Sequence, residues 1–331
     1  MQDPLVSRWT QAPLQEQLAL FVETRAAHAG LPRHEGRPDL RGAPLAGVAL
    51  PGAALDGVDL SEADLTGAEL VGARLAKARL EGADLSRADL SRAQLVGARL
   101  AGARLDEATL TAACLTRADL AGARLEKATL DAAQLEGAAL DGASFHGARL
   151  VNAFLAEATG AAVDLSGADL RLARLQKASL RAPNLARALL DDALMARARL
   201  ERPFLAGASL VRADLRAATL TEPYVDGADL TGARLRAATL PEDLVAGPNG
   251  LDEAARRRED RVLALALPRL GLTDLRALGR RATGEDLDAA RTPDEALRWL
   301  LGIAVRAGGL PALLAALAER LPDRARDLAG L

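Results

Sequence analysis

Residues 83–92 read ADLSRADLSR, which is two consecutive copies of a five-residue unit with a small residue first and leucine third. The same register runs from Leu40 to Leu240, and leucine occupies 37 of the 41 positions numbered in multiples of five. The four exceptions are Phe145, Gly160, Met195 and Val225. One pattern therefore organises about two thirds of the 331 residues.

A period of five fits neither an α-helix nor a single β-strand. Apolar residues recur every 3.6 residues on one face of a helix and every second residue on a strand. A step of five residues would turn a helix by about 140° and spread leucine around its whole surface. The leucine and the small residue two positions earlier both face inward only if the chain turns a corner every five residues. Four such sides make a coil of about 20 residues, and successive coils stack about 4.8 Å apart.

A second period supports four sides. Three prolines lie 20 residues apart at the small inward position: Pro183, Pro203 and Pro223. The outward residues that follow them are also 20 apart: Asn184, Phe204 and Tyr224. In a four-sided coil these residues form one ladder, at a place where the chain bends or the missing proline N–H is not needed.

In these pentads the chain resembles the pentapeptide-repeat family, whose pattern is A(D/N)LXX. The resemblance implies a mainly β solenoid, a right-handed quadrilateral β-helix of about ten coils and roughly 48 Å. We expect the β-helix at 37–240. Residues 1–36 would cap its first coil, because an open solenoid end exposes strand edges and apolar interior. The cap includes an amphipathic helix predicted at 11–28.

The pentad pattern stops at Leu240. Residues 241–250 contain two prolines and two glycines and are interpreted as a linker. From 251 to 331 the apolar period becomes helical, which predicts a small α-helical bundle. Candidate helices lie at 251–267, 273–282, 293–307 and 311–321.

This bundle resembles the effector-associated, death-like adaptor domains of bacterial conflict systems. The resemblance rests mainly on Ala-Leu-Arg-Trp-Leu-Leu at 296–301 and Arg-Ala-Gly-Gly-Leu-Pro-Ala-Leu-Leu at 306–314. It implies homotypic contacts that bring the protein to an effector such as a protease, with Trp299 a candidate interface residue. A helical cap or a dimerisation module remains the alternative.

Charge and cysteine content narrow the function classes. The net charge is −3, and residues 41–240 carry 24 basic and 25 acidic side chains, so the sequence does not predict direct binding to nucleic acid. One cysteine excludes an intramolecular disulfide and suits a reducing compartment. No apolar run approaches the roughly 20 residues of a membrane span. With no signal-peptide profile at the N-terminus, we expect a cytoplasmic protein.

The sequence contains no recognisable catalytic motif. The three histidines lie far apart, and CxxC, HExxH, P-loop and GxGxxG motifs are absent. A filled β-helix also offers no pocket in which reactive groups converge. We therefore predict that the protein is not an enzyme and that it uses no cofactor and no metal.

Exceptions to the pentad mark candidate contact sites. The outward slot before each leucine is usually polar, but it is apolar at Phe154, Leu189, Leu194, Phe204 and Tyr224. We expect these side chains to be exposed and to form a protein interface. Two alternatives are that the C-terminal bundle covers them, or that they form a stabilising ladder. At Gly160, which replaces an inward leucine, the larger Val163 in the next pentad indicates volume compensation.

Three functions remain open. The first is a non-enzymatic scaffold or adaptor that binds protein partners, with the C-terminal domain mediating recruitment or dimerisation. The second follows from the family, in which some members form dimers that mimic duplex DNA and bind DNA gyrase. The near-neutral repeats and the unbroken pentad phase depart from that group. The third is a purely structural spacer.

Overall fold

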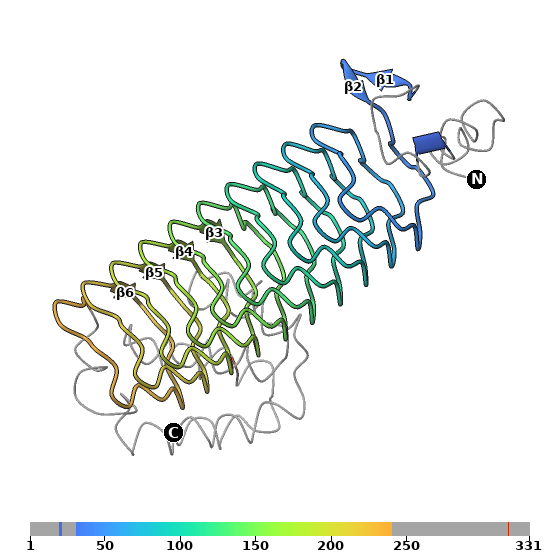
Figure 1. The fold of residues 1–331 in the computed structure, drawn as a ribbon. Coiled ribbons are helices and arrows are strands. Elements are labelled where there is room, and N and C mark those ends of the chain that lie inside the picture. Colours follow the sequence, from blue (N-terminus) through green and yellow to red (C-terminus); the bar gives the residue numbers. More distant parts are fainter. Residues whose placement is uncertain (1–19, 22–30, 240–316, 318–331) are drawn as a thin grey trace.

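The computed structural model describes residues 20–21, 31–239 and 317, and a β solenoid runs through residues 39–239 (Figure 1). Parallel β-bridges join each outward residue to the residue 20 positions further on, starting with Asp39 and Asp59 and ending with Thr219 and Thr239. A 20-residue offset equals four pentads, and ten such offsets lead from Asp39 to Thr239, which makes ten coils. The predicted four-sided coil and the predicted number of coils are confirmed.

The predicted terminal elements lie largely outside the described residues. Leu20 and Phe21, within the helix expected at 11–28, are helical. The linker at 241–250 lies outside the described part, as does the domain at 251–331 apart from the helical Leu317. Those parts of the sequence interpretation remain predictions.

Each side of a coil ends in a turn that the pentad makes possible. The N–H of Ala88 donates to the carbonyl oxygen of Leu85 at 3.0 Å and closes a four-residue turn. Arg87, the third residue of this turn, has φ 57°, the region that a type II turn requires there. Glycine often takes this place, as Gly82 does with φ 68°, because it lacks the Cβ that makes positive φ costly.

The interior is a continuous stack of leucine and alanine. Ala83 and Leu85 have no exposed surface, and the same holds for most inward residues along the rod. Phe145 and Met195, which replace inward leucines, are also completely buried. Backbone hydrogen bonds tie each coil to the next, as from Leu85 N–H to the Arg104 carbonyl oxygen at 2.6 Å. A filled interior and a continuous ladder account for a straight rod.

At one corner of four successive coils, a three-residue strand replaces the usual turn. Thr159–Ala161 (β3), Ser179–Arg181 (β4), Arg199–Glu201 (β5) and Thr219–Thr221 (β6) form a parallel sheet in the order β3-β4-β5-β6 (Figure 1). In three of these coils the next inward residue is proline, which has no N–H to close the usual turn.

The proline ladder predicted from the sequence is confirmed beside these strands. The N–H groups of Phe204 and Tyr224 donate to the carbonyl oxygens of Pro183 and Pro203, each at 2.9 Å. The carbonyl oxygens of these prolines therefore accept hydrogen bonds from the next coil. Proline has no N–H to donate, and the turn at this corner is formed without such a donor.

Gly160 sits in β3 at the start of this corner. A Cβ atom added there would lie 2.8 Å from Val163 Cγ2, closer than Cβ atoms come to other atoms in proteins, and 3.0 Å from the Leu140 carbonyl carbon, which is a tight contact. The valine thus fills the space that the missing leucine leaves, and the predicted volume compensation is confirmed.

A small hairpin precedes the first coil. Arg33–His34 (β1) and Arg37–Pro38 (β2) pair in antiparallel fashion. His34 Nδ1 lies 3.2 Å from the fully buried Asp59 carboxylate, and Arg37 donates to the Gly57 carbonyl oxygen at 3.1 Å. The hairpin is therefore anchored on the first two coils.

Candidate interaction surfaces

A spiral of ion pairs covers the first half of the rod. Arginines spaced 25 residues apart each contact an acid 18 residues earlier in the chain, on the preceding coil. The pairs are Arg74–Asp56, Arg99–Glu81, Arg124–Asp106 and Arg149–Asp131. Exposed pairs of this kind add little stability individually, but they neutralise the surface.

The spiral ends where the surface becomes apolar. The next arginine, Arg174, has Ala156 at the acid position and lies instead over the Phe154 ring, 4.5 Å from its centroid. On the next coil, Leu189 is 39% exposed and Leu194, two rungs from Phe154, is 37% exposed. The predicted exposure of the two leucines is confirmed, and Phe154 remains partly exposed.

The structure adds Leu172, which the sequence reading missed. Leu172 lies in a turn with φ 62°, is 51% exposed, and donates its N–H to the Asp191 carbonyl oxygen of the next coil at 3.0 Å. The sequence pattern of outward slots does not include Leu172, because this residue lies at the turn position. The signal was nonetheless present, because leucine takes this place in no other described pentad with positive φ. We name Phe154, Leu172, Arg174, Leu189 and Leu194 the corner patch.

Phe204 and Tyr224 are buried, which corrects the expectation that they are exposed. They are 1% and 2% exposed, and their rings stack with centroids 4.9 Å apart. They continue a row of outward residues that bridge one another at 20-residue steps and are all buried. This row, here named the buried column, consists of Ser144, Asp164, Asn184, Phe204 and Tyr224.

The first half of the buried column is polar. Asp164 Oδ1 accepts hydrogen bonds from the Ser166 hydroxyl at 2.7 Å and from the Asn184 side-chain amide at 3.1 Å. His146 Nδ1 lies 2.8 Å from the same Ser166 hydroxyl. A buried carboxylate requires donors of this kind, because an unsatisfied charge in the interior is costly. The column thus changes from a hydrogen-bonded end to an aromatic end.

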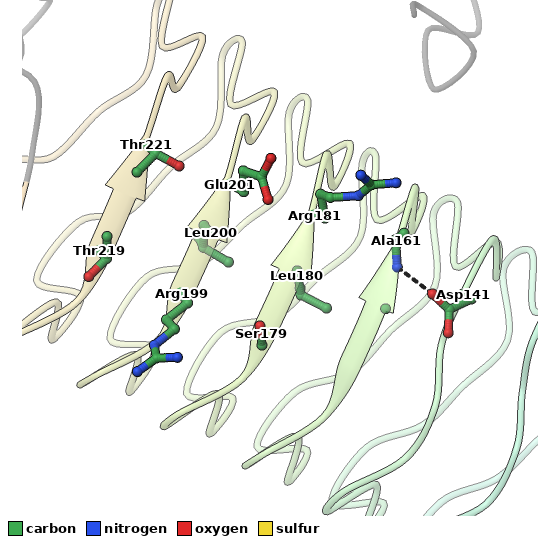
Figure 2. Close-up of a pocket in the computed structure, with 11 residues that line it drawn as sticks. Asp141, Ala161, Ser179, Leu180, Arg181, Arg199, Leu200, Glu201, Thr219 and Thr221 are labelled. Atoms are coloured by element: carbon green, nitrogen blue, oxygen red, sulfur yellow. Dashed lines mark hydrogen bonds between the residues drawn. The ribbon is translucent and has the colours of Figure 1, made fainter.

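A shallow groove of about 450 Å³ crosses β3–β6. Figure 2 shows two rows along its rims, Ser179, Arg199 and Thr219 on one side and Arg181, Glu201 and Thr221 on the other. Asp141 at its end accepts a hydrogen bond from the Ala161 N–H at 2.8 Å. The charges alternate in sign, and the groove brings together hydroxyl, carboxylate and guanidinium groups without a histidine or cysteine.

Bidentate acid–arginine pairs brace several turns. Arg216 donates to both carboxylate oxygens of Asp214 at 2.8 and 2.6 Å, and Arg171 does the same to Asp169. The hydrogen bond from each arginine holds the pKa of its aspartate below the usual value near 3.8 and raises the pKa of the arginine. These aspartates stay ionised and serve the turn geometry.

The described part of the chain offers neither a metal-binding cluster nor a membrane-spanning helix. It contains no group of three or more histidine, cysteine, aspartate or glutamate side chains arranged to hold a metal ion. Its helical residues form no segment with the length and apolar character of a membrane span. Trp299, the remaining candidate interface residue, lies outside the described residues.

Comparison with known proteins agrees with the architecture. The family model for pentapeptide repeats matches eight copies, over residues 39–75, 68–111, 103–140, 138–176 and 205–236. No curated protein matches the chain significantly.

Several solved structures are similar to the chain. HetL, a pentapeptide repeat protein involved in heterocyst differentiation regulation from the cyanobacterium Nostoc sp. strain PCC 7120, is 37% identical over 60% of this chain and 90% of its own, with a TM-score of 0.36. A pentapeptide repeat protein from the Arabidopsis thaliana thylakoid lumen is 30% identical over 35% of this chain and 71% of its own, with a TM-score of 0.20. QnrB1, a plasmid-mediated fluoroquinolone resistance protein, is 18% identical over 55% of this chain and 88% of its own, with a TM-score of 0.25.

The family match covers 170 of the 331 residues, since 39–176 contributes 138 and 205–236 contributes 32. The 20-residue bridges and the inward leucines are the structural expression of that repeat. The chain therefore belongs to the pentapeptide-repeat family.

Proposed function

We propose that this protein is a non-enzymatic scaffold that binds a protein partner through the corner patch. The observation that carries the proposal is Leu172, 51% exposed at φ 62°. A left-handed conformation costs a residue with a side chain about 1 kcal/mol, and an exposed leucine recovers little of that by burial. Charged residues such as Glu62 and Arg87 adopt the same conformation at this turn position, so the distinguishing property of Leu172 is its exposed apolar side chain, which contact with a partner would bury.

The surroundings of Leu172 suit a protein–protein contact. Leu189 and Leu194 lie on either side of the same corner one coil further on. Phe154 with Arg174 stacked over it supplies the aromatic and arginine groups that dominate binding energy at interfaces. The filled interior holds these groups in fixed positions, so little entropy is lost when a partner binds.

The charge pattern favours a scaffold over a DNA mimic. A mimic of duplex DNA needs unneutralised acidic rows, whereas acids such as Glu81, Asp106 and Asp131 are matched by arginines of the next coil. Residues 171–220 carry ten basic and four acidic side chains, which opposes an acidic surface there. We therefore expect no effect of the purified protein on gyrase supercoiling at micromolar concentration.

The helical segment 251–331 is a second contact element under this proposal. It would recruit an effector or join two copies, in keeping with its sequence resemblance to adaptor domains. The rod would then present one partner while the segment engages another. A cytoplasmic setting fits the single cysteine and is part of the same proposal.

The test compares partner binding by the full chain and a patch variant. Substitutions are taken from residues that occupy the same side of other coils, so that the rod keeps its pentads. Leu172→Arg follows Arg92 and Arg212, Leu189→Thr follows Thr109, and Leu194→Gln follows Gln94. Partners are captured in the native cell by cross-linking and quantified by mass spectrometry. We expect the amount of partner captured by the triple variant to be lower than that of the wild type by a factor of ten or more.

The control carries Val71→Thr and Val96→Thr, which remove two exposed apolar side chains (38% and 39%) outside the patch. The control is expected to retain every partner. Equal binding by the patch variant and the wild type would remove the patch from the function. Inhibition or protection of gyrase that survives in the patch variant would favour the topoisomerase hypothesis instead.

A further inference from the structure

The buried column changes character abruptly along one side of the rod. At the equivalent outward slot in the preceding coils, Pro44, Asp64, Arg104 and Arg124 are exposed and Asp84 is partly exposed. From Ser144 onward the five successive members are at most 4% exposed. The bridges at 20-residue steps are continuous from Pro44 to Tyr224. Pairing of the coils is therefore the same in both halves, and another layer must account for the burial.

Stacking within the rod does not hide an outward aromatic ring. Phe154 has the Arg174 guanidinium 4.5 Å from its centroid and the backbone of neighbouring rungs on both sides, yet it stays partly exposed. Phe204 and Tyr224 stack on each other and are nevertheless 1% and 2% exposed. The difference indicates material lying across the face of these rings. Neither ring belongs to the interior core of the rod.

We propose that residues 251–331 of the same chain pack over the buried column. The column spans four rungs, about 19 Å, which a helix of about 13 residues matches. The helices predicted at 251–267 and 293–307 are long enough. Leu317, the one described residue of this segment, is helical and completely buried outside the rod core.

The connection permits this arrangement. The described rod ends at Thr239, less than one coil after Tyr224, so the chain leaves beside the aromatic end of the column. Residues 240–250 span up to about 36 Å when extended, enough to return along the column. Residues 1–30 join the rod at the opposite end, five coils or about 24 Å from Ser144. The C-terminal segment is therefore the nearer candidate.

The column defines the chemistry of the docked surface. Phe204 and Tyr224 require an apolar face such as the leucine-rich stripes of 251–331, whereas Asp164 and Asn184 require polar groups. Docking would hold the segment against the rod through the face that meets the column and leave its other faces for the partner of the proposed function. It is independent of the corner patch, which lies on other sides of the coil.

Photo-cross-linking of the full chain tests the contact directly. Phe204 is replaced by the photoreactive amino acid benzoylphenylalanine, which keeps an aromatic ring at that position. We expect cross-links from position 204 to peptides within 251–331 of the same molecule. Isotopically labelled and unlabelled copies are mixed, so that links between molecules carry both labels and are distinguished by mass. The same amino acid at position 154 is the control and should give no link to 251–331.

Three outcomes would overturn the proposal. Links from position 204 to residues 1–36 would assign the cover to the N-terminal segment, and mixed-label links would assign it to a second copy. Links confined to residues of the rod itself would show that no other segment covers the ring.

Hydrogen exchange provides a second measurement that does not require a reactive group. The variant Phe204→Ser with Tyr224→Asp uses residues that Ser144 and Asp64 show to be compatible with this slot. We expect amides of 251–331 to exchange about tenfold faster or more in this variant, because docking protects them. The rod amides should be unchanged, as should 251–331 in the control Phe154→Gln. Equal exchange in the variant and the wild type would contradict docking at this face.

Discussion

Phe204 and Tyr224 are 20 residues apart in sequence and stack with ring centroids 4.9 Å apart and planes inclined by 15°. This separation follows from the coil, because equivalent residues on neighbouring coils lie about 4.8 Å apart. A rung spacing of that size also suits parallel, offset aromatic rings. The repeat therefore converts any two aromatic residues placed one coil apart in the outward slot into a stacked pair.

The first prediction contrasts this pair with the partly exposed ring of Phe154. Phe204→Ala should lower the free energy of unfolding by about 3 kcal/mol, since it empties a buried site. Phe154→Ala should cost about 1 kcal/mol, the scale of a partly exposed cation–π contact. Urea unfolding followed by circular dichroism measures both. Similar losses in the two variants would mean that the burial of Phe204 contributes nothing to stability.

The second prediction concerns proline at the open and the closed corners. Pro203→Ala should change the free energy of unfolding by less than about 1 kcal/mol, because no turn hydrogen bond is lost there. Ala188→Pro should cost about 3 kcal/mol or more, because the Ala188 N–H donates to the Leu185 carbonyl oxygen at 3.0 Å. Thermal unfolding of the two variants distinguishes the corners. A mild effect of Ala188→Pro would show that the turn bond is dispensable.

Much of the rod follows from the sequence because one local rule repeats without interruption. Leu85 and its equivalents indicate which side chains enter the core, and the 20-residue proline spacing indicates the number of sides. Both were available from the pattern. The role of Val163 beside Gly160 was also predictable, since an interior of fixed width must be filled.

The surface was less predictable, because the outward slot has no required burial. Phe204 and Phe154 occupy equivalent places in the pentad, yet one is buried and the other partly exposed. A pentad pattern does not encode what else packs against an outward side chain, so it could not predict this difference. Leu172 escaped notice for a related reason, since its exposure depends on a turn conformation.

The third prediction is a loss of stability in acid. The folded-state pKa values of Asp169 and Asp214 are held below the usual value near 3.8, chiefly by hydrogen bonds from Arg171 and Arg216. The folded state therefore binds these protons less readily than the unfolded state. The resulting stabilisation is complete above the unfolded-state pKa and is lost as the pH falls from about 4 through the lower folded-state values. Unfolding free energies measured between pH 6 and pH 2 should show this decline.

Substitution distinguishes the contribution of these two aspartates to the acid sensitivity from that of the other carboxylates. The double variant Asp169→Asn with Asp214→Asn should be less stable at pH 6. Its stability should also depend less on pH below 4, because asparagine binds no proton in this range. Glu157, which is exposed and pairs with Lys177, provides the control Glu157→Gln. An unchanged slope in the double variant would place the acid sensitivity elsewhere.

The fourth prediction uses the contact between Gly160 and Val163. Gly160→Ala should destabilise the rod by about 1–3 kcal/mol, since its Cβ would meet Val163 Cγ2 at 2.8 Å. Val163→Ala removes that atom, so the double variant should lose less than the sum of the two single losses. The rescue should be partial, because the Leu140 carbonyl carbon remains 3.0 Å from the new Cβ. A double-mutant cycle of unfolding free energies measures the coupling, and additive losses would show that the valine does not compensate for the glycine.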